Sequence, residues 1–390
     1  MKRDSQSRLR NPGGTGRDSE KPELLEVCVE SVAYGGAGVA RFNGKVIFVP
    51  GTIPGERVLV RLVRNKKRFA EGELIEVLES AEIRIQPQCR WFGACGGCAY
   101  QHVPYELQLD WKFEQVRELF RRVARAEEPP VERVLPSPLA WNYRNRIRVH
   151  GRGGRSGFFR RGTADIVEMD RCAIASEQVN RELSALRTRW KGDGERTISE
   201  RSGVRFFEQT NDGAAEVLGR VVEGMVEGYG GPWLVDAYCG AGWFARRLAP
   251  FFRRVIGIEV HGGAVEEARR LVGMSEEYRC GPVEEHLGEV LSELQVDGSS
   301  GGTMVMDPPE EGVSGRVREV ISAMGPERLI YVSCDPATQA RDVAEFMGAG
   351  YRLCRVVPVD MFPQTADVEV VALLDRCFQD GSEKNQKKSK

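Results

Sequence analysis

Strand-length apolar runs alternate with helix-like stretches in the second half of the chain, and this alternation constrains the fold more than any other feature. Runs typical of strands occupy residues 233–240, 254–260, 302–309, 328–335 and 369–374. Helix-like stretches such as 264–272 and 284–294 lie between them. Such alternation is typical of a doubly wound parallel sheet covered by helices. We therefore predict an α/β domain over residues 203–378.

A glycine-rich turn follows the first of these strands. Asp236 ends the strand, and Gly240-Ala241-Gly242 leads into a helix at the edge of the sheet where α/β proteins bind ligands. The next strand ends in Glu259, whose carboxylate can accept two ribose hydroxyls. These features alone would equally fit a nicotinamide dinucleotide. Together with Asp307-Pro308-Pro309 at the end of the run 302–309, they resemble the pattern of S-adenosylmethionine methyltransferases.

Short β-rich runs fill the first part of the chain. They occupy residues 25–32, 38–42, 45–49, 57–64 and 72–79, with turn-forming sequences such as Asn43-Gly44 between them. Five strands in so short a segment fit a small barrel of the oligonucleotide-binding type, which we assign to residues 23–80. A basic cluster that could contact phosphates follows the fourth strand: Arg64, Lys66, Lys67 and Arg68.

The region between the barrel and the α/β domain, residues 81–202, mixes one clear helix with less regular sequence. The apolar periodicity predicts an amphipathic helix over residues 105–125, which Pro129-Pro130 ends. The face expected to be buried carries Leu109, Lys112, Phe113, Val116, Leu119 and Phe120.

Arginines alternate with aromatic residues after this helix. The arginines are Arg144, Arg146, Arg148, Arg152, Arg155, Arg160 and Arg161, and the aromatic residues are Trp141, Tyr143, Phe158 and Phe159. Arginines can bind RNA phosphates, and aromatic rings can stack on bases. A sheet with one solvated basic face would give the same pattern, but the density of arginines favours RNA binding.

The two halves of the chain carry opposite charge. Residues 1–200 hold 35 basic and 27 acidic side chains, a net charge of +8, whereas residues 201–390 hold 21 and 30, a net charge of −9. A basic half attracts a polyanion such as RNA. The ends, residues 1–22 and 379–390, have almost nothing to bury, so we expect disordered tails.

No apolar run in the first residues has the length that a signal peptide needs, and no later stretch approaches a membrane span. We therefore expect a cytoplasmic protein without a membrane partner. We also expect it to be a monomer. In a reducing compartment the ten cysteines are not expected to form disulfides, so a tight group of them indicates metal binding or catalysis.

Four cysteines have a spacing that indicates metal binding. Cys89, Cys95 and Cys98 lie close together, and Cys172 follows far downstream. Four thiolates could hold zinc, but structural zinc usually uses two short knuckles. Three close cysteines with one remote cysteine are more typical of iron–sulfur cluster ligation.

A further cysteine, Cys334, leaves an apolar strand at the ligand edge of the sheet, where it could act as a nucleophile. The run Ser333-Cys334-Asp335-Pro336-Ala337-Thr338, with Asp307-Pro308-Pro309 upstream and residues 360–369 (DMFPQTADVE) downstream, resembles the RNA uracil-5-methyltransferase family. It is similar to the iron–sulfur branch that acts on 23S ribosomal RNA. The resemblance covers roughly residues 24–377.

The resemblance implies a role for each matching residue. It implies that Cys334 is the nucleophile and Glu369 the base, and that residues 25–78 form the family's TRAM domain. The implied S-adenosylmethionine contacts are Gln209, in the run Phe207-Glu208-Gln209-Thr210-Asn211, with Tyr238, Glu259 and Asp307. The implied ligands of a four-iron four-sulfur cluster are Cys89, Cys95, Cys98 and Cys172.

This pair of residues suits methylation at carbon 5 of uracil. Thiolate addition at carbon 6 turns a weak carbon nucleophile into an enolate, and a base must then remove the proton on carbon 5. Both faces of the target ring must be reached, so the uridine must leave any base stack.

Three residues differ from those that are usual at the matching positions of the family. They are Trp243 after the glycine turn, Pro282, and Glu310 after Asp307-Pro308-Pro309. None of them replaces the nucleophile or the base. The alternatives are tRNA uracil-5 methylation, an inactive iron–sulfur RNA-binding protein, and a cytosine-5 RNA methylase. A cytosine enzyme should carry a second cysteine where Glu310 and Glu311 stand.

Overall fold

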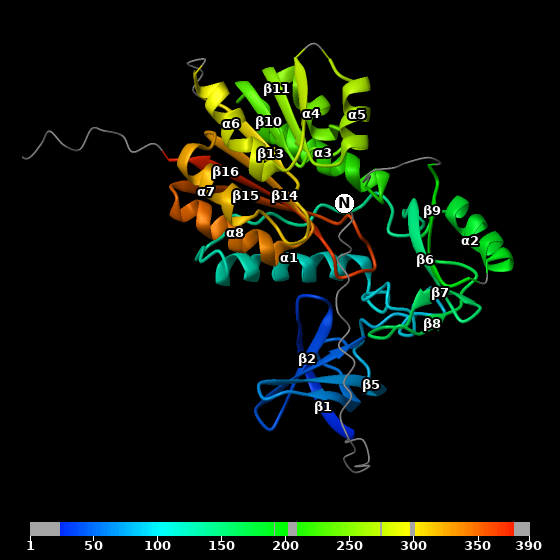
Figure 1. Cartoon of the computed structure of the whole chain (residues 1–390). Helices are drawn as coiled ribbons and strands as arrows, with labels where there is room; N and C mark the ends of the chain where they lie inside the picture. Colours follow the sequence, from blue (N-terminus) through cyan, green and yellow to red (C-terminus); the bar gives the residue numbers. More distant parts are fainter. Residues whose placement is uncertain (1–23, 191, 202–208, 274, 297–300, 378–390) are drawn as a thin grey trace, which may run out of the picture. The chain divides into compact units, whose positions relative to one another are not determined.

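The computed structural model describes residues 24–190, 192–201, 209–273, 275–296 and 301–377 (Figure 1). The predicted tails, 1–22 and 379–390, lie outside these residues. Two compact units are present, whose described parts are residues 24–31 with 38–80, and residues 32–37 with 81–377.

The first unit is built on a closed five-stranded barrel. Its strands, in the order β1-β2-β3-β5-β4, are β1 (Leu24–Val32), β2 (Ala37–Phe42), β3 (Lys45–Pro50), β4 (Arg57–Asn65) and β5 (Phe69–Glu79). Alternate residues such as Val27 and Val58 face a shared core, as period-2 patterning requires. The five predicted strands are confirmed. Lys66–Arg68 lie in the loop before β5, whereas Arg64 belongs to β4 and pairs with Glu71 at 2.9 Å.

A small sheet and one helix form one part of the second unit. The sheet, in the order β8-β7-β6-β9, contains β6 (Arg146–Arg152), β7 (Arg155–Phe159), β8 (Ile166–Val167) and β9 (Gly194–Ser199). Helix α2 (Glu177–Arg189) packs on it through Val179 and Leu183, which join Ile147 and Val149 in one core cluster. Ser176 caps α2 by accepting a hydrogen bond from the Val179 backbone N–H.

Helix α1 (Tyr105–Arg122) confirms the predicted amphipathic helix, but its buried face differs from the expectation. Lys112, Val116 and Phe120 are buried as predicted. Leu109, Phe113 and Leu119 are only half-buried, and two glutamines, Gln108 and Gln115, occupy buried positions instead. The helix therefore presents polar groups to the interior, where each needs a hydrogen-bond partner.

A seven-stranded sheet dominates the second unit (Figure 1). Its strands, in the order β12-β11-β10-β13-β14-β16-β15, are β10 (Gly231–Ala237), β11 (Phe252–Glu259), β12 (Glu276–Cys280), β13 (Thr303–Met306), β14 (Arg328–Ser333), β15 (Tyr351–Val359) and β16 (Glu369–Arg376). The five predicted strands are present, and β12 and β15 are additional.

Helices cover both faces of this sheet, as expected for a doubly wound domain. Residues of α1, α6 (Val283–Val296), α7 (Gly315–Met324) and α8 (Pro336–Gly348) share one core cluster. Residues of α3 (Asp212–Val226), α4 (Trp243–Leu248) and α5 (Gly262–Arg270) share the other, and a short 3₁₀ helix, η1 (Ala249–Phe251), follows α4.

The prediction that the sheet is parallel throughout is wrong at one side. Strands β10 to β14 are parallel to their neighbours, but β16 runs antiparallel to both β14 and β15. Apolar periodicity identifies a buried strand without giving its direction. Within the described residues, no helix is both long and apolar enough to span a bilayer.

Candidate active site and cysteine cavity

Strand register brings three of the expected cofactor-side residues to one edge of the large sheet. Ala237 pairs with Ile258 on one side and with Met306 on the other. The residues that follow these three are Tyr238, Glu259 and Asp307, so they lie level with one another at the carboxyl ends of adjacent parallel strands. This edge is where open α/β sheets bind ligands.

The glycine turn beside this edge is held by the same carboxylates. Gly240 donates its backbone N–H to Glu259 Oε2 at 3.0 Å, and Ala245 donates to Asp236 Oδ2 at 2.8 Å. Tyr238 has a φ of 64°, which is rare for a residue with a side chain. Gly242, at φ 75°, has no room for a side chain, since a Cβ would lie 2.4 Å from the Tyr278 hydroxyl. The backbone is thus fixed close to any ligand at this edge.

Two carboxyl groups at this edge, the fully buried Asp236 and the half-buried Asp307, hold protons more tightly than a free aspartate does. Burial raises the pKa of Asp236 to about 8. Burial likewise raises the pKa of Asp307 to about 7. The Asp236 Oδ1 atom has no hydrogen-bond partner within the described residues. A bound cation would favour the ionised form of both groups.

Cys334 and Glu369 face each other at the ends of adjacent strands. Ser333 of β14 pairs with Val370 of β16, and because these strands are antiparallel, the residue after Ser333 lies opposite the residue before Val370. Those residues are Cys334 and Glu369. Cys334 is exposed, while Glu369 is only 3% exposed. The expected nucleophile is thus open to a substrate, and the expected base lies behind it in an enclosed position.

Burial and neighbouring carboxylates raise the pKa values of both residues of this pair. Partial burial of the thiol, followed by the charges of Glu369 and Asp307, raises the pKa of Cys334 to about 12. Burial, together with the charge of Asp307, raises the pKa of Glu369 well above its usual value. A carboxyl group with a raised pKa is suited to accept a proton near neutral pH.

Gln209 lies at the entrance to α3. Its carbonyl accepts a hydrogen bond from Asn145 Nδ2 at 3.1 Å, and the following Asn211 caps the helix through the Ala214 backbone N–H. Gln209 itself is half-buried. Phe207 and Glu208, which belong to the same expected motif, lie outside the described residues.

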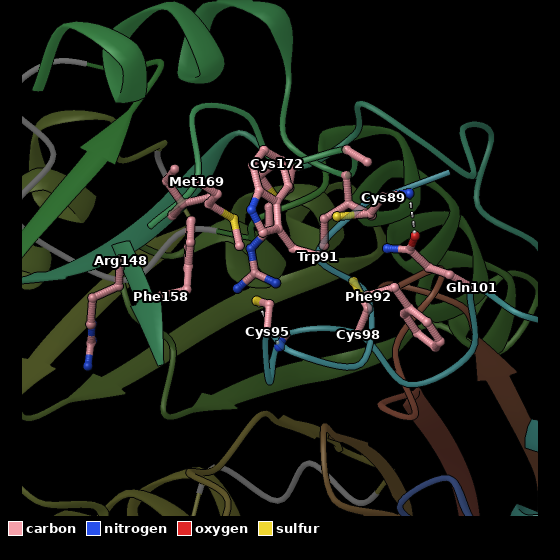
Figure 2. A pocket seen from close by; sticks show the side chains of 15 residues that line it. Cys89, Trp91, Phe92, Cys95, Cys98, Gln101, Arg148, Phe158, Met169 and Cys172 are labelled. Carbon is pink, nitrogen blue, oxygen red and sulfur yellow. Dashed lines mark hydrogen bonds between the residues drawn. The ribbon is translucent and has the colours of Figure 1, made fainter. Parts of the chain in front are cut away.

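A cavity of about 160 Å³ lies among the four expected metal-binding cysteines (Figure 2). Cys89, Cys95, Cys98 and Cys172 all line it, together with aromatic residues such as Trp91 and Phe92. Every sulfur donor in its wall is therefore one of the predicted cysteines or Met169.

Polar side chains fix the backbone of these cysteines. Gln101 Oε1 accepts from the Cys89 backbone N–H at 3.1 Å (Figure 2), and Asn180 Oδ1 accepts from that of Cys172 at 2.8 Å. Arg161 donates to the Cys98 carbonyl. Within the described part of the chain, no three His, Cys, Asp or Glu side chains converge tightly enough to hold one metal ion.

The arginine-rich segment forms the small sheet, with apolar residues inward and most arginines outward. Arg148, Arg152 and Arg155 are exposed, and Arg148 lies 3.6 Å from Glu195. The aromatic residues have mixed positions, which corrects their prediction as a stacking set. Tyr143 is buried and donates to the Pro363 carbonyl at 2.9 Å, and Phe159 stacks on His150 at 3.9 Å.

The three residues that depart from the family text lie around the same edge. Trp243 begins α4, and Glu310 is exposed in the turn after β13. The Pro282 carbonyl accepts from the backbone N–H of Glu285 at the start of α6. None of them separates Cys334 from Glu369.

Known proteins resemble this chain along nearly its whole length. The family profile described as "tRNA (Uracil-5-)-methyltransferase" matches residues 194–377, and a TRAM domain profile matches residues 19–75. An uncharacterized RNA methyltransferase of Bdellovibrio bacteriovorus is 32% identical, over 90% of this chain and 94% of that protein. Another, from Gloeobacter violaceus, is 30% identical over 93% of this chain and 99% of that protein.

One solved structure shares the architecture. It is the Pyrococcus abyssi tRNA (uracil-54, C5)-methyltransferase in complex with S-adenosyl-L-homocysteine, with a TM-score of 0.65 and 25% identity, covering 90% of this chain and all of that one. The likeness thus includes the barrel, the central region and the large sheet. With the profile matches and the relatives, it shows that the chain belongs to the RNA uracil-5-methyltransferase family of S-adenosylmethionine-dependent enzymes and carries an N-terminal TRAM domain.

Proposed function

We propose that this enzyme methylates carbon 5 of a uridine in 23S ribosomal RNA, with Cys334 as the nucleophile and Glu369 as the base. The register of β14 and β16 carries this proposal, because it sets a thiol opposite an enclosed carboxyl group at the cofactor edge. Gln209, Tyr238, Glu259 and Asp307 are the proposed cofactor contacts.

The reaction requires an addition and an elimination. The Cys334 thiolate adds to carbon 6 of the uracil, and the electrons of the carbon 5–carbon 6 double bond move into the carbonyl at carbon 4 to form an enolate. With S-adenosylmethionine bound, the electron pair of the enolate would form the bond between carbon 5 and the methyl group, and the bond from the methyl group to sulfur would break to leave neutral S-adenosylhomocysteine. Glu369 removes the remaining proton from carbon 5, the double bond re-forms, and the bond between carbon 6 and sulfur breaks to return the thiolate.

The charge of the cofactor matters for the first step. When bound, S-adenosylmethionine supplies the methyl group on a positively charged sulfonium. In the free protein, the raised pKa of Cys334 keeps the thiol protonated at neutral pH. A positive charge at the same edge opposes the carboxylates Glu369 and Asp307 and thereby favours the thiolate.

We further propose that Cys89, Cys95, Cys98 and Cys172 hold a four-iron four-sulfur cluster. A zinc ion draws four thiolates to within about 2.3 Å of one point, whereas a cluster spreads its ligands around a larger body. All four cysteines line one cavity, which supports a shared site, and their spacing of three close residues and one remote residue favours a cluster over zinc. Such a cluster would tie residues 89–98 to Cys172, and methyl transfer requires no electron from it.

RNA binding is assigned to the barrel, residues 23–80, and to the central region, residues 81–202. The exposed arginines of the small sheet can bind phosphates while the target uridine is turned out of its stack. The catalytic domain spans residues 203–378. We place the enzyme in the cytoplasm as a monomer.

A second candidate substrate is tRNA, and the likeness to the Pyrococcus abyssi enzyme favours it. Mapping 5-methyluridine in the 23S ribosomal RNA and in the tRNA of a deletion strain separates the two. Loss of one 23S position supports the proposal, and loss in tRNA alone replaces it with the second candidate. Loss of 5-methylcytosine instead would indicate a cytosine enzyme.

The catalytic pair can be tested with labelled cofactor and substrate RNA. Cys334→Ala should give neither methylated product nor a covalent RNA adduct. Glu369→Gln should accumulate methylated RNA joined to the protein, which migrates slowly on denaturing gels. Undiminished turnover by folded Cys334→Ala protein would overturn the covalent mechanism, and a wild-type protein that binds RNA without transferring methyl groups would be an inactive relative.

A further inference from the structure

The segment that leads into Glu369 has no regular structure of its own. Residues 360–368, here called the base loop, join β15 to β16 without a helix or strand. Yet Asp360 is 0% exposed and Gln364 is 2% exposed. A buried irregular segment must have its backbone groups bonded by other parts of the chain.

Four consecutive carbonyls of the base loop accept hydrogen bonds from outside it. The pairs are Asn211 Nδ2 to the Met361 carbonyl at 3.0 Å, Lys112 Nζ to that of Phe362 at 3.1 Å, the Tyr143 hydroxyl to that of Pro363 at 2.9 Å, and the Ala99 and Tyr100 backbone N–H groups to that of Gln364 at 2.9 and 3.0 Å. The donors come from α1, from the central region and from the entrance to α3. The loop is therefore shaped by its surroundings.

Gln108 of α1 bonds both the backbone and the side chain of Gln364. Its Oε1 atom accepts from the Gln364 backbone N–H at 3.0 Å, and its Nε2 atom donates to Gln364 Oε1 at 3.0 Å. The same Nε2 atom also donates to the carbonyls of Tyr100 and Val103. One buried amide thus joins the helix, the segment after Cys98 and the base loop.

Gln364 needs this support because its backbone is strained. Its φ of 71° lies in the left-handed region, which is unfavourable for a residue with a side chain and persists only where the surroundings impose it. Hydrogen bonds of Thr365 also fix the backbone between Gln364 and Glu369. The Thr365 hydroxyl donates to the Phe362 carbonyl at 2.8 Å and accepts from the Asp367 backbone N–H at 3.2 Å.

Lys112 holds the other end of the loop. Its ammonium group lies 2.6 Å from Asp360 Oδ1, and both side chains are 0% exposed. Because Lys112 also bonds the Phe362 carbonyl, it fixes the point where the chain leaves β15. Gln108 and Lys112 lie four residues apart on α1, so one face of the helix contacts both parts of the loop.

We infer that Gln108 and Lys112 are positioning residues for Glu369, so that α1 sets the rate of proton removal and release of the methylated RNA. The inference rests on the proposed function of Glu369. A general base must lie within hydrogen-bond reach of the proton that it removes, and a displacement of about 1 Å can slow a step about a hundredfold. Cys334 follows β14, whereas the base loop leads into β16. Loosening the loop should therefore slow elimination more than addition.

The test is Gln108→Leu in the full-length protein, with labelled cofactor and substrate RNA. The measured quantity is the ratio of methylated RNA bound covalently to the protein to methylated RNA released. We expect this ratio to rise about tenfold or more over wild type, approaching that of Glu369→Gln. A merely structural role would lower addition, methyl transfer and release together and leave the ratio unchanged.

Gln115→Leu is the matched control. Gln115 lies on the same helix, is also buried, and donates to the Tyr100 hydroxyl at 3.1 Å. No hydrogen bond joins it to the described base loop. We expect its ratio to match wild type, and an equal rise in both variants would show that any damage to α1 suffices, which overturns the inference.

A second variant tests the inference independently if Gln108→Leu does not fold. Gln364→Asn keeps a residue that tolerates positive φ, but shortens the side chain that Gln108 bonds. It should raise the same ratio, and a wild-type ratio in this folded variant would contradict the inference. Absence of methyl transfer by the wild-type enzyme would instead defeat the proposed function, so the two failures are distinguishable.

Discussion

Replacing Lys112 with methionine should destabilise the packing of α1 by about 3–5 kcal/mol, because the change leaves a buried carboxylate without its partner. The Lys112 and Asp360 side chains are fully buried and 2.6 Å apart. Asp360 Oδ2 has no hydrogen-bond partner within the described residues, and the adjacent Tyr105 hydroxyl is a neutral group that cannot balance the carboxylate charge. Loss of the bond to the Phe362 carbonyl adds about 1 kcal/mol at most, since the Thr365 hydroxyl still donates to it.

A double-mutant cycle separates the charge from the packing. Lys112→Met and Asp360→Leu should each be strongly destabilising, because each leaves one buried charge. The double variant replaces the pair with apolar side chains and should lie within about 1 kcal/mol of wild type. If each single variant costs about 3 kcal/mol or more, the coupling energy should therefore be about 5 kcal/mol or more.

Local stability is the quantity to measure, because a chain with two compact units need not unfold in one step. Amide hydrogen exchange of peptides from residues 105–122, read by mass spectrometry in the free enzyme, reports the opening free energy of α1. If the double variant were as unstable as Lys112→Met, the cost would come from lost packing, and the reasoning from buried charge would be refuted.

Three further predictions concern ligands. Because burial raises the pKa of Asp307 to about 7, its carboxyl is neutral below that pH, so affinity for cationic S-adenosylmethionine should rise about fivefold from pH 6 to pH 7 and level off above pH 8. Calorimetry should find this rise flattened in Asp307→Asn and weaker for S-adenosylhomocysteine, which lacks the sulfonium charge. Anaerobically purified protein should be brown, with about four iron and four sulfide per chain, and should lose them in Cys172→Ser; zinc without iron would contradict the cluster. Deleting residues 23–80 should weaken salt-sensitive RNA binding but not cofactor binding, and unchanged RNA affinity would remove the barrel from the RNA-binding surface.

Sequence patterns predicted the buried strands of the large sheet because those strands are continuous apolar runs. Strand β12 escaped prediction because it contains Glu276, Glu277 and Arg279 and lies at the edge of the sheet, where one side needs no apolar cover. Strand β15 escaped because Arg352 and Arg355 interrupt its apolar pattern beside a register shift. Central strands are buried on both faces and are therefore recognisable as apolar runs, whereas edge strands can carry charged residues.

The sequence predicted the individual residues of the candidate site, because each of them lies next to an apolar run that predicts a strand. Cys334 and Glu369 are both adjacent to apolar runs, but only the register of β14 and β16 shows that they are opposite each other. Gln108 and Gln115 were not predicted to be buried, since an amide on an amphipathic helix normally indicates the solvent side. Their partners are backbone groups far along the chain, which no local pattern encodes.

The reversed direction of β16 also determines when the catalytic centre becomes complete during synthesis. In a parallel strand the first residue would lie at the opposite edge from Cys334, so only a reversed strand can bring its first residue, Glu369, to the thiol. Strand β16 inserts between β14 and β15, both of which precede it in the chain. A nascent chain that has emerged only as far as β15 therefore contains the proposed nucleophile, Cys334, without the proposed base, Glu369. Because β16 is the last strand of the described chain, the proposed catalytic pair is complete only after this strand has joined the sheet.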